Sequence, residues 1–154
     1  MSSKFGHVII TSSCIFCRSA LSYAFVNKKP IAPGHVLVAS DREAKRFNDL
    51  SPEEVSDLFK LVHRISPIIQ KVFNATALTI AIQDGAAAGQ TVEHVHVHIV
   101  PRIEGDPLQD DRIYEVLQTH EKKDDIKWRT DNEMETEATL LKEYFEENDD
   151  EYQQ

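Results

Sequence analysis

Three histidines alternate with valine in the stretch EHVHVHIVPR, residues 93–102. The residues between and after His94, His96 and His98 are β-branched, which predicts a strand: Val95, Val97, Ile99 and Val100. Side chains two residues apart share one face of a strand, so we expect the three imidazoles to point the same way, roughly 6.6 Å apart at about 3.3 Å of rise per residue. Imidazoles can carry protons, attack phosphorus or bind a metal, and aligning three of them costs desolvation. This strand is therefore the predicted working surface.

A second strand is expected to pair with the histidine strand. The segment TALTIAIQ (residues 76–83) alternates apolar and polar residues, and the loop DGAAAGQTV (residues 84–92) joins it to the histidines. This arrangement predicts an antiparallel hairpin in which Gln83 lies near His94. Small residues in the loop would let the backbone approach a phosphate closely, and its glycine and polar positions include Gly85, Gly89, Gln90 and Thr91.

Phosphoryl transfer is the first chemistry that this arrangement suggests. A neutral imidazole can attack phosphorus, and a covalent route divides one displacement into two, from donor to histidine and from histidine to water. His96 is flanked by the other two histidines and is the expected attacker, while His98 is placed to serve the leaving group. Backbone amides and the side chains of Gln83, Gln90 and Thr91 are expected to stabilise charge on the phosphoryl oxygens.

Metal binding is the alternative use of a His-x-His pattern. A metal site would favour an added carboxylate, and none lies on the same predicted strand face, although Glu93 and Glu104 are nearby in the sequence. Cys14 and Cys17 form a C-x-x-C, which fits a metal half-site, a redox pair or simply two semi-buried thiols. The residues leave these interpretations of the two cysteines open.

The elements that must position the histidines can also be predicted. SYAFVN (residues 22–27) and HVLVAS (residues 35–40) are expected strands around a proline-rich turn. A helix should begin after Ser51, with Pro52 in its first turn and Glu54 completing a capping box. Its apolar residues then follow helical spacing: Val55, Leu58, Phe59, Val62, Ile65, Ile69, Val72 and Phe73.

Pro67 is expected to kink or divide that helix after Ser66. Residues 104–132 are polar, with one expected helical turn over residues 113–117. A closing helix is predicted over residues 133–147, with an apolar side made of Leu140, Leu141, Tyr144 and Phe145.

Composition limits the possible functions. The 154 residues are 41% hydrophobic and 28% charged, which suits one globular domain. A net charge of −9 argues against nonspecific nucleic-acid binding, and no apolar run reaches membrane-spanning length. No signal-peptide pattern opens the chain, so a cytosolic or nuclear protein is the default expectation. Plain surface positions are the expectation for His7, His63 and His120, and also for Lys28, Lys29 and Arg102, which are the nearest candidate cations. Tyr114, on a polar segment, is either a modification site or a surface residue.

The stretch GQTVEHVHVHIVPR strongly resembles the signature of the histidine triad family. Further stretches are similar to its fragile histidine triad branch: FVNKKPIAPGHVLV, RFNDLSPEEVSDLF, LTIAIQDGAAAGQTV and KWRTDNEMETEATLLKEYF. The resemblance extends over about residues 4–146. It implies hydrolysis of dinucleoside polyphosphates, with diadenosine triphosphate cleaved to AMP and ADP, no tightly bound cofactor, and Mg²⁺ or another divalent cation accompanying the substrate.

The resemblance also implies roles for individual residues. His96 would form a nucleotidyl-histidine, and His98 would contact the α-phosphate on the leaving-group side. His94 and His35 would support the site from behind, and Asn27 would hold the ribose. Gln83, Gly89, Gln90 and Thr91 would line the phosphates, and Gln83 would help to distinguish polyphosphate hydrolases from phosphoramidases.

The fold implied by the resemblance is α+β, a HIT-like five-stranded antiparallel sheet with two main helices, in which two subunits form a continuous sheet. A single domain is expected over residues 1–146, followed by an acidic tail over residues 147–154. One departure concerns Cys14 and Cys17, which look more like the opening of the other branch, where some members bind structural zinc. Since RFNDLSPEE contains no histidine, structural zinc is not expected here.

Two rival functions fit the same residues. The first is a purine nucleoside phosphoramidase, the activity of the sister branch. The second is a nucleotide-sensing signalling protein whose substrate complex is the output, because its binding residues would be the same.

Overall fold

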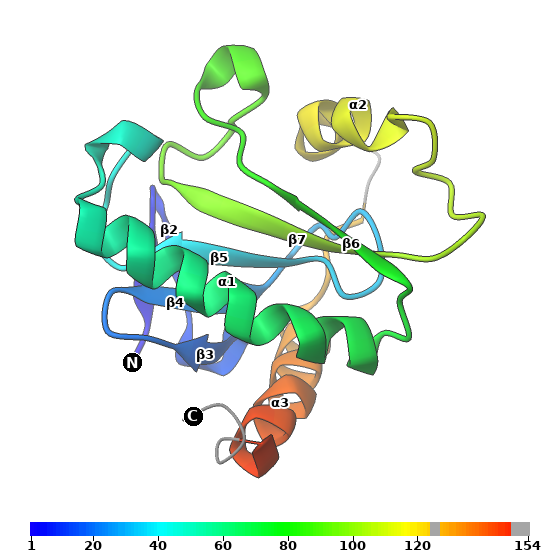
Figure 1. Cartoon of the computed structure of the whole chain (residues 1–154), viewed down its shortest axis with the longest axis horizontal. Coiled ribbons are helices and arrows are strands. Elements are labelled where there is room, and N and C mark those ends of the chain that lie inside the picture. The colour runs from blue at the N-terminus through cyan, green and yellow to red at the C-terminus, as the bar shows by residue number, and fades with distance from the viewer. Residues whose placement is uncertain (124–126, 149–154) are drawn as a thin grey trace.

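The computed structural model describes residues 1–123 and 127–148, and over these ranges the chain forms seven β-strands and three α-helices (Figure 1). The strands are β1 (Ser3–Phe5), β2 (Val8–Ile10), β3 (Ile15–Arg18), β4 (Ser22–Val26), β5 (Val36–Ser40), β6 (Ala77–Ala81) and β7 (His96–Arg102). The α-helices are α1 (Pro52–Val72), α2 (Arg112–Thr119) and α3 (Asp131–Asn148). Short 3₁₀ turns are η1 (Ser12–Cys14), η2 (Phe47–Asp49), η3 (Ala86–Ala88) and η4 (His120–Lys122).

Within the described ranges, a main sheet of five antiparallel strands has the order β3-β4-β5-β7-β6, and β1 and β2 form a separate hairpin. The expected five-stranded antiparallel sheet is therefore confirmed. The pairing of β6 with β7 also confirms the predicted hairpin, with Ala81 opposite His98. The shorter α2 adds a third helix to the two main helices that were expected.

The main sheet separates two kinds of side chain. One face is aliphatic and packs against α1 and α3, through residues that include Ala24, Val26, Val36, Val38, Val97 and Ile99. The opposite face carries Tyr23, Phe25, Leu37 and Ala39 together with His96 and His98. Side chains alternate along β7, so this one strand contributes to both faces. Val97 and Ile99 lie in the core, and His96 and His98 lie on the opposite face.

The predicted start of α1 is confirmed. Ser51 Oγ accepts the Glu54 N–H, and the Glu54 carboxylate accepts the Ser51 N–H, which completes the capping box. The prediction that Pro67 divides the helix is wrong, because α1 runs from Pro52 to Val72 without a break. Pro67 offers no N–H to the preceding turn, and Ser66 Oγ donates to the carbonyl of Val62 at 2.6 Å, so hydroxyl bonding supplements the local helical ladder.

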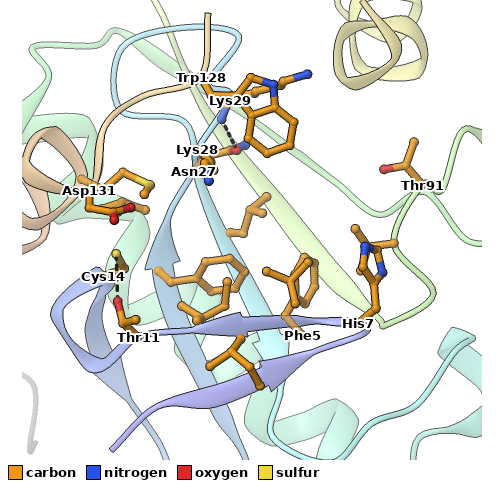
Figure 2. Close-up of a pocket in the computed structure, with 18 residues that line it drawn as sticks. Phe5, His7, Thr11, Cys14, Asn27, Lys28, Lys29, Thr91, Trp128 and Asp131 are labelled. Carbon is orange, nitrogen blue, oxygen red and sulfur yellow. Dashed lines mark hydrogen bonds between the residues drawn. The ribbon is translucent and has the colours of Figure 1, made fainter. Parts of the chain in front are cut away.

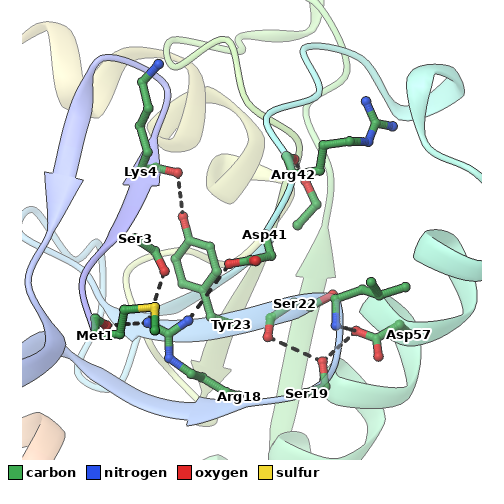
Figure 3. Close-up of polar contacts among 12 residues, drawn as sticks. Met1, Ser3, Lys4, Arg18, Ser19, Ser22, Tyr23, Asp41, Arg42 and Asp57 are labelled. Carbon is green, nitrogen blue, oxygen red and sulfur yellow. Dashed lines mark hydrogen bonds and ion pairs between the residues drawn. The ribbon is translucent and has the colours of Figure 1, made fainter.

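The β1–β2 hairpin lies over the face of the sheet that carries the histidines. Figure 3 shows how its N-terminal arm is attached to the sheet: the Tyr23 hydroxyl donates to the Lys4 carbonyl, and Arg18 donates to Ser3 Oγ and the Met1 carbonyl. On the apolar side of this contact, Phe5 packs against the edge of Phe25 with ring centroids 5.1 Å apart. The hairpin therefore covers one end of the sheet face that carries His96 and His98.

Helix α2 covers the other end of the same face. Ile113 and Leu117 pack with Leu108 against Val100 of β7. Residues 104–132, which the sequence predicted to hold one helical turn, thus contain a complete α2 whose amphipathic side docks on the sheet. His96 and His98 thus lie along β7 between the part covered by the hairpin and the part covered by α2.

Several sequence predictions need correction. Strand β7 begins at His96, so His94 lies before the strand and not on it. Phe59 and Leu140 were placed on apolar sides of helices but are exposed. Helix α3 runs from Asp131 to Asn148, so it begins two residues before and ends one residue after the predicted range 133–147. The rest of the predicted tail, residues 149–154, lies outside the described residues. Among the residues that the structure describes, no helix is long and apolar enough to span a membrane.

Candidate active site

His96 and His98 lie next to one another on the open face of β7. Their ring centroids are 4.9 Å apart, and both side chains are buried. Across the sheet, His98 is in register with Leu37 and His96 with Ala39. The small side chain of Ala39 leaves room beside His96, and Phe5 of the hairpin meets its ring edge-on at 5.0 Å.

The hydrogen bond of His96 fixes its tautomer. Its Nδ1 lies 2.6 Å from the backbone carbonyl oxygen of His94. A carbonyl oxygen can only accept, so Nδ1 carries the proton and the in-plane lone pair is on Nε2. His96 is therefore prepared as a nucleophile through Nε2, and the backbone of His94 supplies the group that orients it.

His94 itself serves the architecture. Its Nε2 donates to the Ser40 carbonyl oxygen at 2.7 Å, and its Nδ1 accepts the Gly6 N–H at 3.2 Å. These bonds connect the end of β5 to the turn of the β1–β2 hairpin. The expectation that His94 supports the site from behind is consistent with this position, although its ring does not share the strand face of the other two.

A second chain of hydrogen bonds orients His98. The Ile31 N–H donates to His35 Nδ1 at 3.1 Å, so His35 carries its proton on Nε2. His35 Nε2 then donates to His98 Nδ1 at 2.9 Å, which leaves the proton of His98 on Nε2. This Nε2 is buried, and it has no hydrogen-bond partner among the residues that the structure describes. His98 thus presents an N–H donor that a ligand would satisfy.

Burial keeps these histidines neutral. Desolvation, together with smaller effects of the neighbouring His120, His96 and Arg129, lowers the pKa of His35 to about 3. Desolvation also holds the pKa of His98 well below its ordinary value, with smaller effects of His96 and His35, and lowers that of His94. A neutral His98 donates one proton from Nε2 without carrying a buried charge.

A cavity of about 320 Å³ opens beside these rings (Figure 2). Its floor is apolar and comes from the hairpin and the sheet, through Phe5, Ile10, Phe25 and Leu37. Asn27 lies at its polar side, where the side-chain amide is 3.4 Å from the ring nitrogens of His35 and its Oδ1 accepts the Lys29 N–H. The cavity is mainly apolar and has the Asn27 amide, in contact with His35, at its polar side, as a nucleoside would require.

The loop between β6 and β7 places the remaining predicted site residues. Gln83 and Gly89 are in contact, because a Cβ at Gly89 would lie 2.6 Å from Gln83 Nε2. Gln90 lies within the loop: its Oε1 accepts the Gly85 N–H at 2.8 Å, and its Nε2 donates to the carbonyls of Lys45 and Val92. Thr91 is exposed and lines the cavity. The side chain of Gln90 therefore shapes the loop.

Other residues named from the sequence have definite places. Arg102 pairs with Asp106 at 2.7 Å and donates to Thr79, so its charge is already compensated. Cys14 and Cys17 are buried free thiols, and Cys14 lines the cavity. His7 is exposed, as expected, whereas His120 is half-buried and lies close enough to His35 to affect its pKa. In residues 1–123 and 127–148 no three side chains of His, Cys, Asp or Glu gather as metal ligands.

The sequence reasoning missed the walls of the cavity. Phe25 and Leu37 face each other across β4 and β5, two positions from Asn27 and His35 respectively. The two-residue period could have placed them beside those polar residues. Trp128 and Gln118 could not be found in this way, because they come from segments distant in the sequence that the fold brings to the site.

Comparison with known proteins agrees with this geometry. The family model of the HIT domain matches residues 11–105. The bis(5'-adenosyl)-triphosphatase of Dictyostelium discoideum is 45% identical, with 94% of this chain and 93% of that protein covered. The asymmetrical bis(5'-nucleosyl)-tetraphosphatase of Schizosaccharomyces pombe is 44% identical, with 88% of this chain and 90% of that protein covered.

Among solved structures, the diadenosine triphosphate hydrolase of Plasmodium falciparum in complex with cyclomarin A superposes with a TM-score of 0.80 at 38% identity, covering 95% of this chain and 85% of that chain. The match of the family model, the level of identity and the arrangement of His94, His96 and His98 lead to one conclusion. This chain belongs to the HIT, or histidine triad, family.

Proposed function

We propose that this protein is a dinucleoside polyphosphate hydrolase that cleaves diadenosine triphosphate to AMP and ADP through a nucleotidyl group on His96. The observation that carries the proposal is the bond from His96 Nδ1 to the His94 carbonyl, which leaves the lone pair of the neutral ring on Nε2, the nitrogen that can attack phosphorus. The names of the relatives from Dictyostelium and Plasmodium support the same substrate class.

The reaction follows from the two tautomers. His96 Nε2 attacks the α-phosphorus, a P–N bond forms, and the bond from phosphorus to the bridging oxygen of the leaving ADP breaks. The N–H of His98 Nε2 stabilises the charge that develops on the phosphoryl oxygens or the leaving oxygen. The imidazolium formed at His96 keeps its Nδ1–H bonded to the His94 carbonyl. Water then attacks phosphorus, the electron pair of the P–N bond returns to His96 Nε2, and the protons of the water leave with AMP and the solvent, so that His96 is neutral again.

The nucleotidyl intermediate can be tested by trapping. Rapid acid-free denaturation of the enzyme during turnover of diadenosine triphosphate, followed by peptide mass spectrometry, should find an adenylyl group on His96. His96→Asn should abolish turnover while keeping substrate affinity, since the amide cannot attack but fills similar space. An adduct on another residue, or turnover by His96→Asn, would reject the proposed nucleophile.

Substrate comparison separates the alternatives. Because the relatives include a triphosphatase and a tetraphosphatase, diadenosine triphosphate and tetraphosphate should be compared at equal concentration. We expect both to be cleaved and the triphosphate to give the higher kcat/KM. Faster turnover of an adenosine phosphoramidate would instead indicate the activity proposed for the sister branch. A cellular phenotype that survives His96→Asn would favour a signalling role of the substrate complex.

We also propose a homodimer built on the edge strand β6. The β3 edge is close to the N-terminal arm and α3, whereas β6 carries the exposed Ile80. Pairing two β6 edges around a two-fold axis would extend the sheet across both subunits and cover this edge. Light scattering of the purified protein should give twice the chain mass, and Ile80→Lys should shift it toward the monomer while Leu140→Lys, on α3, should not.

A further inference from the structure

One side of the cavity is formed by a segment that lies far from the histidines in the sequence. Trp128 lines it from the segment between α2 and α3, and its side chain is 53% exposed. Figure 2 shows the indole on the side of the cavity opposite Phe5 and His7 of the β1–β2 hairpin. An exposed indole is unusual on the surface of a monomeric domain, and here it borders an apolar space of nucleoside size.

Arg129 holds this wall in place. Its backbone N–H donates to the Lys28 carbonyl at 3.0 Å, and its guanidinium donates to the Asn27 carbonyl through both Nε at 2.9 Å and Nη2 at 2.6 Å. The same guanidinium forms an ion pair with Glu137 of α3. The position of Trp128 is therefore coupled to Asn27, which is itself in contact with His35.

The wall also carries positive charge. Lys28 Nζ lies 4.9 Å and Lys29 Nζ 4.2 Å from the centre of the indole ring, within the range of cation–π contacts. Both lysines line the same cavity. In a chain with a net charge of −9, two ammonium groups at one rim form a local site of attraction for a polyanion.

We propose that Trp128 is a substrate-binding residue that stacks on the base of the nucleoside bound in the cavity, with Lys28 attracting the phosphate chain and Arg129 acting as the positioning residue. The proposal rests on the proposed function, because it assumes that the cavity holds the nucleoside whose phosphate is transferred. Trp128 completes a space whose other side is formed by Phe5 and Ile10. Base–aromatic stacking of this kind is worth roughly 5- to 150-fold in affinity.

Fluorescence offers a direct test, since Trp128 is the one tryptophan of the chain. We would titrate the His96→Asn variant with AMP, with diadenosine triphosphate and with inorganic tripolyphosphate, following indole emission. Saturable quenching by AMP and by the dinucleotide, without quenching by tripolyphosphate, is the expected result. If calorimetry detects AMP binding and the emission does not change, the proposal is wrong. It is also wrong if only the dinucleotide quenches, because Trp128 would then contact the second nucleoside.

Kinetics of variants gives an independent test. Trp128→Ala should raise the KM for diadenosine triphosphate about tenfold with kcat within about twofold, a loss in the range of a base–aromatic contact, and Trp128→Phe should restore most of the affinity. Arg129→Ala should raise KM similarly, and the double variant should lose little more, because both changes remove one contact. An unchanged KM in Trp128→Ala, or fully additive losses, would overturn the assignment.

The charge is tested separately. Lys28→Ala should raise the KM for the dinucleotide several-fold, whereas Lys60→Ala, an exposed lysine on α1, should leave it unchanged. Equal effects of the two changes would reject a specific role for Lys28. If the enzyme cleaves dinucleotides but AMP binding does not change the indole emission, the stacking role of Trp128 is rejected and the proposed hydrolase activity stands. If AMP quenches the emission but the enzyme does not cleave dinucleotides, the proposed hydrolase activity is rejected and Trp128 remains a nucleotide-binding residue.

Discussion

Each histidine of the site has a partner that dictates where its proton lies. The carbonyls of His94 and Ser40 can only accept, and the Ile31 N–H can only donate. The rings are thus assigned different chemistry although their side chains are identical. The alternation of histidines in the sequence could predict a shared surface, but the tautomers depend on backbone groups that only the fold brings to the rings.

Neutral buried histidines make the stability of the fold depend on pH. Burial lowers the pKa of His35 to about 3 and that of His98 in the same direction, whereas both titrate near 6.5 in the unfolded chain. The unfolded state therefore binds more protons between these values, so this contribution to stability is complete above pH 6.5 and is lost as the pH falls toward the folded pKa. Between pH 7.5 and 5.0 the change in protonation of His35 should lower the free energy of unfolding by about 2 kcal/mol, and His98 acts in the same direction.

Urea unfolding at the two pH values measures this difference. In His35→Gln the free energy of unfolding should fall between pH 7.5 and 5.0 by about 2 kcal/mol less than it does in the wild type. The matched control is His63→Gln, since His63 is exposed on α1, and it should retain the full loss. The pH window lies above the titration of Glu54 and Asp106 in both states, because their pKa values are about 4 in the unfolded chain and hydrogen bonds with Arg42 and Arg102 hold them at about 2 in the fold. Identical losses in wild type and His35→Gln would contradict the assignment.

At the scale of elements, the loop between β6 and β7 works because Gly89 has no side chain. Its φ is +93°, and a Cβ would lie 2.6 Å from Gln83 Nε2 and 2.7 Å from Gln118 Cγ of α2. Gly89→Ala should therefore displace both glutamines, lower kcat/KM for diadenosine triphosphate about tenfold or more, and destabilise the fold by about 1–3 kcal/mol. Steady-state kinetics and urea unfolding measure the two effects.

Gly105 provides the matched control for this substitution. Its φ is +80°, in the same left-handed region, but beyond its two chain neighbours no described residue has an atom within 4 Å of the position that a Cβ would take. Gly105→Ala should carry a similar backbone cost and keep kcat/KM within about twofold. If both variants lose activity equally, backbone strain rather than contact with Gln83 is the cause.

The elements also show which features of the fold the sequence could predict. Ser51 and Glu54 predicted the start of α1 correctly because a capping box is a local signal. The polarity of α2 concealed its docking, since Ile113 and Leu117 find their partner in Val100 only through the tertiary fold. Strand β7 begins two residues later than the histidine pattern suggests, because the ring of His94 bonds to Ser40 and to the hairpin turn instead of continuing the ladder.

For the whole molecule, the balance of charge sets a condition on the substrate. Twenty-six acidic and 17 basic residues give a net charge of −9, yet the proposed substrate is a polyanion. Lys28 and Lys29 offer local compensation at the cavity, and Arg102 is already paired with Asp106. A divalent cation bound to the phosphate chain would lower the remaining repulsion, so we propose that Mg²⁺ enters with the substrate.

Entry of Mg²⁺ with the substrate predicts how activity responds to metal and salt. Without Mg²⁺ the KM for diadenosine triphosphate should rise about threefold or more with a smaller change in kcat, and the difference should narrow in high salt, which screens the same repulsion. Enzyme incubated with a chelator and then dialysed should recover fully when Mg²⁺ is added to the assay, because the cation arrives with the substrate. Initial rates over a range of Mg²⁺ and NaCl concentrations measure both effects. Activity that is lost after chelation and returns only with a transition metal would instead indicate a resident metal and revive the metal-binding interpretation of the histidines.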